Sequence, residues 1–585
     1  MTLSKYAAGM SIKQLRQAYL NGDATPEEVV KDIIRRAEED ASMNTWITPP
    51  RMERIRPYLD RLADLKMDDA PLWGIPFAIK DNIDWAGVPT TAACPDYQYV
   101  PNEHATVVAR LIAAGAIPLG KTNLDQFATG LVGIRSPYGE THNALKSELI
   151  SGGSSSGSAV AVARGHAAFS LGTDTAGSGR VPAALNGIVG YKPSLGAWPT
   201  KGVVPACASL DCVSVFALTL DEALIVDKVV RGLDESDPWS RNVPLPVSAN
   251  PNRMLLPEEP LRFFGPYAQQ YEQAWQRTLD KLKKLDIPIQ PVSTKVFHQA
   301  ANLLYGGPFV GERWAGLGSF IEAHPDSVLP VTDQILRTGS AERYDGASVF
   351  KAIHALQAYK LEASKLLKDA VLVMPTAGGT WTRDQVRNDP VATNSDMGMY
   401  TNHCNLLDLC GVAVPSGIIE DNVPFGITIF ALAENEGYAI GAAERFGGAL
   451  APARQALAPS PRHTLVAVCG LHMRGLPLEK QMQQCRAKFV REDKTAAKYE
   501  LYRLPTLPPK PGLVKQEVGG SSIHLEIWEM PLETFGAFAA TIPAPLGIGK
   551  VELQDGTEVP GFLCEAYVTE VAEDITSFGG WRAVI

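Results

Sequence analysis

The feature that most constrains this chain is a pair of glycine- and serine-rich segments set in apolar sequence. The first, Ser151–Ser158, reads SGGSSSGS, and the second, Leu171–Arg180, reads LGTDTAGSGR. A flexible linker has a similar composition, but core-like apolar sequence on both sides makes that interpretation weak. A phosphate loop is also a poor match, because no Gly-Lys-Ser/Thr follows the glycines. The two segments therefore indicate a site built inside a folded domain.

Ser178 is the candidate nucleophile of the second segment. The glycines on either side of it, Gly177 and Gly179, let the backbone approach a ligand closely. A serine in such a turn can meet a substrate beside converging backbone N–H groups, which supply an oxyanion hole. What Ser178 then needs is a base.

Lys80 is the candidate base. It ends the apolar run of the upstream segment Trp73–Asn82, WGIPFAIKDN, so we expect its ammonium to be drawn into the interior. Burial disfavours the charged form and lowers the pKa of a lysine. A neutral lysine amine can accept a proton, which an exposed one at pH 7 does not. A lysine that simply pairs with an aspartate at the end of a strand fits the same residues.

These three segments, in this order and spacing, resemble the amidase signature family over roughly residues 10–450. The resemblance implies that Ser178 is the nucleophile and that Lys80 is the general base and later the acid. It also implies that Ser154, held through an unusual cis peptide, relays the proton between them. The chain has Ser156 where the loop of the family usually has glycine, a small change that leaves the three catalytic residues intact.

The resemblance further implies an oxyanion hole and two residues that brace its loop. Asp174 and Arg180 are expected to hold the loop in place and not to react. The family commonly has glycine at the position of Ala176, which is a small change. The four implied donors are the backbone N–H groups of Thr175, Ala176, Gly177 and Ser178.

A later segment, Leu304–Trp314, narrows the substrate; it reads LYGGPFVGERW. It resembles the allophanate hydrolase subgroup of the family, in which a tyrosine and an arginine of such a segment hold the carboxylate of the substrate. Those roles map to Tyr305 and Arg313, and a planar guanidinium matches a carboxylate in bidentate fashion. From the residues alone, a helix salt bridge for Arg313 and core packing for Tyr305 stay open.

The tail of the chain carries a second resemblance. Val466–Leu478 is similar to the start of the C-terminal domain of the allophanate hydrolase subgroup, which has a γ-glutamylcyclotransferase-like fold. Ile575–Arg582 fits the end of that domain. His472 is the candidate for a polar role there, with a structural histidine as the alternative, and Glu479 stands where the family often has asparagine.

By these resemblances the expected activity is hydrolysis of a linear amide C–N bond in a small anionic substrate, allophanate (urea-1-carboxylate), in urea or biuret nitrogen catabolism. The expected products are ammonia and N-carboxycarbamate, whose decarboxylation to carbon dioxide the tail assists. No cofactor or metal is expected. A separate urea carboxylase or biuret hydrolase would supply allophanate, and the family favours a homodimer. The alternatives are a malonamidase- or biuret-type amidase, a non-catalytic scaffold and an amidotransferase subunit.

The pattern of apolar and polar residues changes along the chain and predicts two domains. Short apolar runs alternate with helical stretches from about residue 72 to residue 191, which indicates an α/β architecture. With the family resemblance, we expect a mixed central sheet covered by helices over residues 1–450, mostly helical across 255–370. Residues 451–462 are expected to be a linker rich in Ala and Pro. Residues 463–585 are expected to form a smaller α+β, barrel-like domain. Expected strands include Pro76–Ile79, Ala116–Leu119 and Ala168–Leu171, and expected helices include Ala105–Ala114 and Ser156–Arg164.

Composition disfavours several other classes of protein. The net charge of -10 argues against a nucleic-acid partner, since an acidic surface repels phosphate backbones. The 8 cysteines include no CxxC pair, which argues against a zinc site. Their low density suits a reducing cytosol better than a disulfide scaffold. No stretch of about 18 uncharged apolar residues is present, so no membrane span is expected. A soluble, cytoplasmic protein is the expectation.

Overall fold

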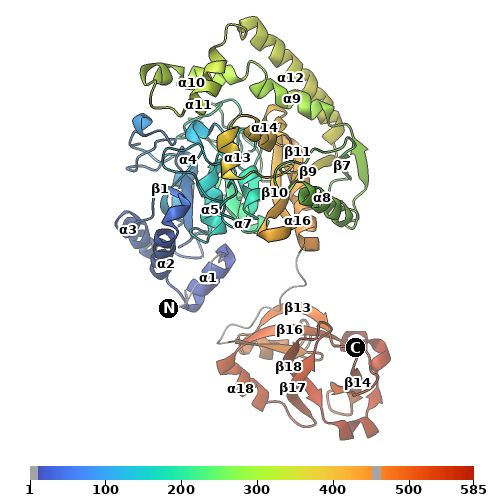
Figure 1. Cartoon of the computed structure of the whole chain (residues 1–585). Helices are drawn as coiled ribbons and strands as arrows, with labels where there is room; N and C mark the ends of the chain where they lie inside the picture. Colours follow the sequence, from blue (N-terminus) through green and yellow to red (C-terminus); the bar gives the residue numbers. More distant parts are fainter. Residues whose placement is uncertain (1–10, 451–462, 585) are drawn as a thin grey trace. The chain divides into compact units, whose positions relative to one another are not determined.

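The computed structural model describes residues 11–450 and 463–584. It divides into two compact units, Met1–Leu450 and Ala451–Ile585 (Figure 1). The expected linker, residues 451–462, lies outside the described residues. None of the helices in the described ranges combines the length and the apolar character that crossing a bilayer requires.

The first unit is built on one large sheet. Its strands are β1 (Trp46–Thr48), β2 (Pro76–Lys80), β3 (Ile117–Thr122), β4 (Phe169–Thr173), β5 (Val189–Lys192), β6 (Val213–Ala217), β7 (Arg253–Pro257), β8 (Ile289–Val292), β9 (Ala370–Pro375), β10 (Leu409–Ile418) and β11 (Pro424–Leu432). They form an 11-stranded sheet in the order β1-β3-β2-β4-β6-β5-β10-β11-β9-β7-β8. Strands β2 and β4 pair in parallel and β10 and β11 pair antiparallel, so the predicted mixed sheet is confirmed.

Helices cover this sheet, as Figure 1 shows. They are α1 (Ile12–Asn21), α2 (Pro26–Glu39), α3 (Met52–Asp60), α4 (Thr106–Ala113), α5 (Ser156–Ala163), α6 (Val181–Leu185), α7 (Leu220–Val230), α8 (Ala268–Leu282), α9 (Lys295–Tyr305), α10 (Val310–Ala323), α11 (Pro330–Arg337), α12 (Gly346–Leu367), α13 (Arg383–Asn388), α14 (Ala392–Gly398), α15 (His403–Leu406) and α16 (Glu436–Leu450). The expected strands and helices are confirmed, with small shifts at their ends.

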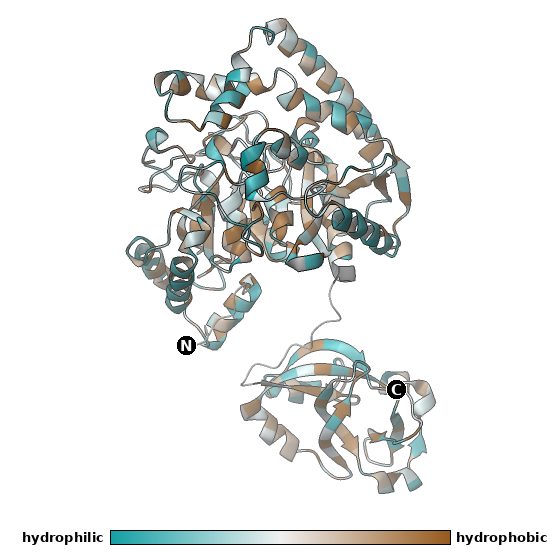
Figure 2. Ribbon diagram, viewed as in Figure 1, coloured by the Kyte–Doolittle hydropathy of each residue, from teal (hydrophilic) through white to brown (hydrophobic). Residues whose placement is uncertain are grey.

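Local sequence explains these elements. Helix α2 begins at a capping box, in which the Thr25 side chain accepts a hydrogen bond from the N–H of Glu28 and Pro26 opens the helix. Strands β2 and β9 are nearly continuous apolar runs that are buried throughout, as strands covered by helices on both faces must be. Figure 2 shows this apolar character concentrated in the inner strands, while the outer helices carry polar faces.

One stretch holds an element that the sequence pattern did not reveal. Residues 255–370 are mostly helical, as expected, but they also contain the end of β7 and the whole of strand β8. Only Val292 of its four residues is buried, so neither an apolar run nor a clear alternation marks the strand in the sequence.

Two neighbouring strands bring the predicted catalytic segments together. Strands β2 and β4 pair in parallel, with Ile79 beside Leu171. Because parallel strands end at the same edge of a sheet, Lys80 at the end of β2 lies close to Thr173 at the end of β4. Helix α5, which follows the loop carrying Ser154, packs against both strands.

Helix α5 approaches its neighbours closely because Gly157 has no side chain. A Cβ at that position would lie 2.2 Å from the carbonyl oxygen of Thr45 and 2.6 Å from the backbone nitrogen of Asn123. Both distances are shorter than any van der Waals contact allows. This glycine therefore fixes how tightly the serine-rich loop is held against the sheet.

The second unit is a smaller, β-rich domain with its own apolar core. Its elements are β12 (His463–Val468), α17 (Glu479–Gln484), β13 (Lys488–Lys494), β14 (Tyr499–Leu504), β15 (Lys510–Lys515), β16 (His524–Pro531), α18 (Leu532–Ala540), β17 (Leu546–Glu552), β18 (Glu558–Cys564) and β19 (Glu573–Asp574). A 5-stranded sheet has the order β13-β16-β12-β18-β17, and a 3-stranded sheet has the order β15-β14-β19.

Candidate active site

Lys80 sits at the centre of the predicted site. Its side chain is fully buried. Its Nζ donates to Ser154 Oγ at 2.8 Å and to Thr173 Oγ1 at 2.7 Å. The structure therefore joins two of the three predicted catalytic residues by a direct hydrogen bond, and it adds Thr173, to which the sequence assigned no role.

Burial sets the protonation of Lys80. Removal from water lowers the pKa of Lys80 from 10.5 to about 7, although Asp125, Asp211 and Asp174 attract its charge and raise that pKa in part. The positive charge of Arg313 lowers the pKa further. A lysine with such a pKa is partly neutral at physiological pH, which is what proton acceptance requires.

The alternative interpretation of Lys80, an ion pair with an aspartate at a strand end, is instead realised by a different lysine. Lys121 of β3 lies 3.2 Å from Asp81, and both side chains are fully buried. Among the described residues, Lys80 has no carboxylate within ion-pair distance. The neighbouring pair thus leaves the amine of Lys80 free of a fixed counter-ion.

Ser154 is held by the loop in front of α5. The Gly153–Ser154 peptide bond is cis, as the family resemblance implied. The carbonyl oxygen of Ser154 accepts a hydrogen bond from the N–H of Asp125 at 3.0 Å. The carboxylate of Asp125 in turn accepts from the backbone N–H groups of Gly133 and Arg135, so it organises the loop that faces Ser154.

Ser178 and its turn present unpaired polar groups. The Ser178 side chain is 4% exposed, and its hydroxyl makes no hydrogen bond to any residue that the structure describes. Within the same described ranges, the N–H groups of Thr175, Ala176 and Ser178 donate to no acceptor. The fourth expected donor differs, because the N–H of Gly177 donates to Asp174 Oδ1 at 2.7 Å. Three of the four predicted donors are thus free beside the Ser178 hydroxyl.

Asp174 and Arg180 brace this turn, as the sequence predicted. Arg180 donates to both carboxylate oxygens of Asp174, at 2.8 and 2.9 Å, and the N–H of Gly179 donates to the same carboxylate. Burial raises the pKa of Asp174, but the Arg180 guanidinium outweighs it and holds that pKa below its usual value. Asp174 is therefore a fixed anion whose carboxylate oxygens accept hydrogen bonds from groups of the loop itself.

Three further residues hold the turn and were missed in the sequence. Asp211 accepts from Thr175 Oγ1 at 2.5 Å, Thr401 Oγ1 donates to the carbonyl oxygen of Ala176 at 2.8 Å, and Asn405 donates to the carbonyl oxygen of Asp174 at 2.6 Å. Thr401 and Asn405 lie more than two hundred residues along the chain from the turn. No local signal announces contacts at that separation.

Tyr305 and Arg313, the two residues expected to hold a carboxylate, contact each other. Arg313 is 1% exposed, and its Nη2 donates to Tyr305 Oη at 3.0 Å while its Nη1 donates to Thr129 Oγ1 at 2.8 Å. Within the described ranges no carboxylate lies at ion-pair distance from Arg313, so the alternative of a helix salt bridge is not realised. Attraction by surrounding groups, Tyr305 foremost, outweighs burial and raises the pKa of Arg313 above its usual value.

Tyr305 and Arg313, called the clamp from here on, belong to the same packed region as the turn that carries Ser178. Ala176, Cys207 and Leu304 lie in a single apolar cluster, against which Tyr305 packs. The charge of Arg313 reaches Lys80 and affects its pKa. Tyr305 and Ala176 of the turn therefore lie in the same packed region of the first unit.

The tail has a separate cavity of about 210 Å³ that contains the predicted histidine. His472 stacks on Phe562, with ring centroids 5.0 Å apart, and its Nε2 lies 2.9 Å from Gln481 Oε1. Burial lowers the pKa of His472. Lys510 lines the same cavity, so the site holds a neutral imidazole beside a cationic residue.

The described residues gather no group of three or more His, Cys, Asp or Glu side chains that could hold a metal ion. All eight cysteines are free thiols. Cys94 and Cys469 are buried, and free cysteines in such positions pack as small apolar side chains.

The chain belongs to the amidase signature family. The family model described as Amidase matches residues 28–438, and that described as Allophanate hydrolase C-terminal domain matches residues 464–585. Within the family the chain is a hydrolase homologous to allophanate hydrolase. It is 38% identical to the solved structure of Kluyveromyces lactis allophanate hydrolase, with a TM-score of 0.72 and 99% of each chain covered.

Curated relatives agree with this assignment. The chain is 38% identical to the urea amidolyase of Lachancea kluyveri over 97% of its own length, but it spans only 33% of that relative. It is also 38% identical to the urea amidolyase of Saccharomyces cerevisiae, covering 92% of this chain and 31% of that protein. The chain thus corresponds to about a third of the urea amidolyases it matches.

Proposed function

We propose that this chain hydrolyses allophanate to ammonia and N-carboxycarbamate through an acyl-enzyme on Ser178. One observation carries the proposal. The buried amine of Lys80 is hydrogen-bonded to Ser154 Oγ, and the guanidinium of Arg313, which has no carboxylate partner in the described ranges, lies close enough to lower the pKa of Lys80. The similarity to Kluyveromyces lactis allophanate hydrolase over 99% of both chains supports this choice of substrate.

In the first step, Ser178 Oγ attacks the carboxamide carbon of allophanate. The proton of Ser178 passes to Ser154 Oγ, and Ser154 gives its own proton to the neutral amine of Lys80. The new oxyanion lies within reach of the unpaired backbone N–H groups of Thr175, Ala176 and Ser178. A donor in such a hole contributes about 3–4 kcal/mol to lowering the barrier.

In the second step, the tetrahedral intermediate collapses. The proton held on Lys80 returns through Ser154 to the departing nitrogen, and ammonia leaves. Water then attacks the acyl-enzyme and gives one proton through Ser154 to Lys80. Lys80 returns that proton through Ser154 to Ser178 Oγ as the serine leaves, and the product is N-carboxycarbamate, so one water is consumed for each ammonia released.

Arg313 and Tyr305 would hold the carboxylate of allophanate. The guanidinium of Arg313 is fixed by Thr129 and Tyr305 but has no carboxylate partner in the described ranges, and its Nε makes no hydrogen bond. The guanidinium therefore keeps donor capacity that a planar carboxylate can use. An anionic substrate would supply the missing carboxylate partner, which supports a small amide with a carboxylate as the substrate over a neutral one.

The tail would act on the product. N-carboxycarbamate loses carbon dioxide to give carbamate, and carbamate breaks down to ammonia and carbon dioxide. The cavity with His472 and Lys510 offers an imidazole that can accept or give a proton and a cation that attracts a carboxylate. The supply of allophanate would come from a separate urea carboxylase or biuret hydrolase, and the chain would form a homodimer.

Ammonia release from the purified chain tests this proposal. The substrates are allophanate, malonamate, biuret and simple amides, and the proteins are wild type, Ser178→Ala and Arg313→Ala. A strong preference for allophanate, no activity in Ser178→Ala and a large loss in Arg313→Ala are the expected results. A preference for a neutral amide that Arg313→Ala leaves unchanged would refute the substrate assignment and favour a malonamidase- or biuret-type amidase.

A further inference from the structure

A second buried arginine lies beside the clamp. Arg135 is 3% exposed, and its Nη1 donates to the carbonyl oxygen of Thr129 at 3.0 Å. Arg313 donates to the hydroxyl of the same threonine. The Nε atoms of both arginines are buried without a hydrogen bond. Two guanidiniums thus converge on Thr129, each with donor capacity unused.

The charge of Arg135 has no dedicated counter-ion among the described residues. Asp125 attracts it, but the carboxylate oxygens of Asp125 accept hydrogen bonds from the backbone N–H groups of Val132, Gly133 and Arg135 itself. The remaining guanidinium donor, Nη2, goes to the carbonyl oxygen of Pro390. Buried charges in proteins are ordinarily paired, so this arrangement indicates that an anion from outside completes it.

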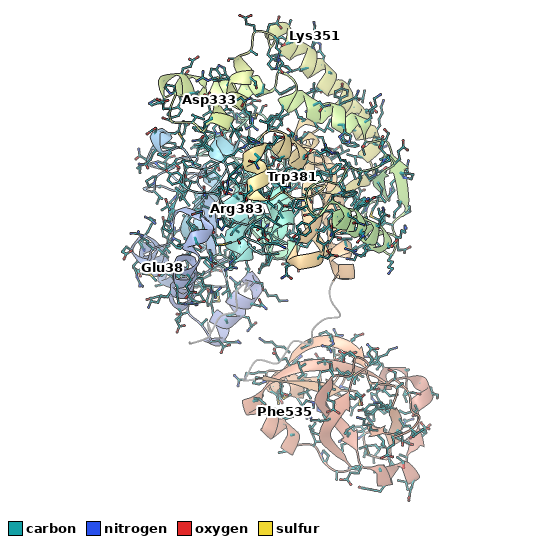
Figure 3. The ribbon with its side chains drawn as sticks, in the orientation of Figure 1. Glu38, Asp333, Lys351, Trp381, Arg383 and Phe535 are labelled. Carbon is teal, nitrogen blue, oxygen red and sulfur yellow. The ribbon has the colours of Figure 1, made fainter. Side chains whose placement is uncertain are left out.

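A cavity of about 560 Å³ opens onto these groups, and Arg135, Thr129 and Tyr305 all line it. Asp396 is the sole carboxylate among its described lining residues, and Arg262 neutralises it at 3.0 Å. Helix α11, marked by Asp333 in Figure 3, contributes the uncharged Gln334 and Ile335 to the wall. Asp333 itself is paired with Arg337. The net unpaired charge on this cavity is therefore positive.

We propose that Arg135 is a specificity-determining residue, which together with Arg313 makes the enzyme selective for amides that carry a carboxylate. The inference rests on the function proposed above. The cavity is much larger than allophanate, so shape alone discriminates poorly between allophanate and biuret, whose carboxamide replaces the carboxylate at nearly the same size. A fixed cation discriminates between allophanate and biuret. Low-dielectric surroundings strengthen the attraction of the cation for the carboxylate of allophanate, whereas the neutral carboxamide of biuret has no charge to attract.

The test measures kcat and KM of the full chain for allophanate and biuret in wild type, Arg135→Gln and Arg135→Lys. The matched control is Arg337→Gln, which removes an arginine that lies outside the cavity and is already paired. We expect Arg135→Gln to lower the allophanate-to-biuret ratio of kcat/KM by about 10- to 30-fold, mainly through KM for allophanate. Arg135→Lys should keep most of the ratio, and Arg337→Gln should keep all of it.

The possible failures are distinguishable. If wild type does not prefer allophanate, the proposed function fails. If wild type prefers allophanate and Arg135→Gln leaves the ratio unchanged, or lowers kcat/KM equally for both substrates, the role of Arg135 is refuted while the function stands. Arg135→Met, which keeps most of the side-chain volume without its charge, covers the case in which Arg135→Gln does not fold. An unchanged allophanate-to-biuret ratio of kcat/KM in Arg135→Met would also overturn the proposal.

Discussion

Replacing Thr173 by valine tests whether the buried amine of Lys80 is the working base. Thr173 Oγ1 is one of the two hydroxyl oxygens to which Lys80 Nζ donates, and valine keeps the shape while removing that oxygen. A hydrogen bond to a charged group contributes about 1.5–3 kcal/mol and one between neutral groups about 0.5–1.5 kcal/mol. The loss therefore destabilises the ammonium relative to the neutral amine by about 1 kcal/mol.

The loss of this hydrogen bond should lower the pKa of Lys80. One pKa unit corresponds to about 1.36 kcal/mol, so the pKa of Lys80 should fall by about 0.7 unit. The acidic limb of the kcat/KM profile, placed near pH 7 by the pKa of Lys80, should move down by the same amount. The assay is ammonia release from about pH 5.5 to about pH 9, a range that spans the limb.

Thr173→Ser is the matched control, because it keeps the hydroxyl. Its acidic limb should stay where the wild type has it. If Thr173→Val also keeps the limb in place, or moves it to higher pH, then the limb does not report the ionisation of Lys80. The assignment of the base would then be wrong, whatever the loss in rate.

Three further changes probe other parts of the site. Asp174→Asn leaves the buried guanidinium of Arg180 without its anion, so chemical denaturation should show the first unit destabilised by about 3 kcal/mol or more. Arg313→Ala removes a positive charge that lowers the pKa of Lys80, so the acidic limb should move to higher pH, and KM for allophanate should rise about 100-fold as a charged contact is lost. His472→Gln should leave ammonia release by the amidase step unchanged and slow carbon dioxide release, which carbon-13 NMR of labelled allophanate would follow.

The sequence contains much of the catalytic arrangement because its motifs are local. Ser178 lies in a turn whose glycines are adjacent in the chain, and Lys80 ends an apolar run that any buried strand would show. The α/β pattern follows from apolar runs of strand length alternating with helices. These signals depend on residues that are neighbours in the sequence, so they can be recognised without any knowledge of the fold.

What the sequence did not reveal depends on contacts between distant segments. Asp211, Thr401 and Asn405 hold the turn through hydrogen bonds to backbone atoms or to the Thr175 hydroxyl, and each comes from its own part of the chain. Lys121, by contrast, ends an apolar strand much as Lys80 does, and only the register of β2 and β3 decides that it pairs with Asp81. The N–H of Gly177 was expected to face the substrate, but the side chain of Asp174 reaches it first.

The most direct test of the account is to find the covalent intermediate. The wild-type chain is mixed with allophanate, quenched rapidly in acid, digested and analysed by mass spectrometry. A substrate-derived mass is expected on the peptide that carries Ser178 and should be absent in Ser178→Ala, whose kcat should fall by at least about 10⁴-fold. An adduct on another residue, or Ser178→Ala with substantial remaining activity, would contradict it.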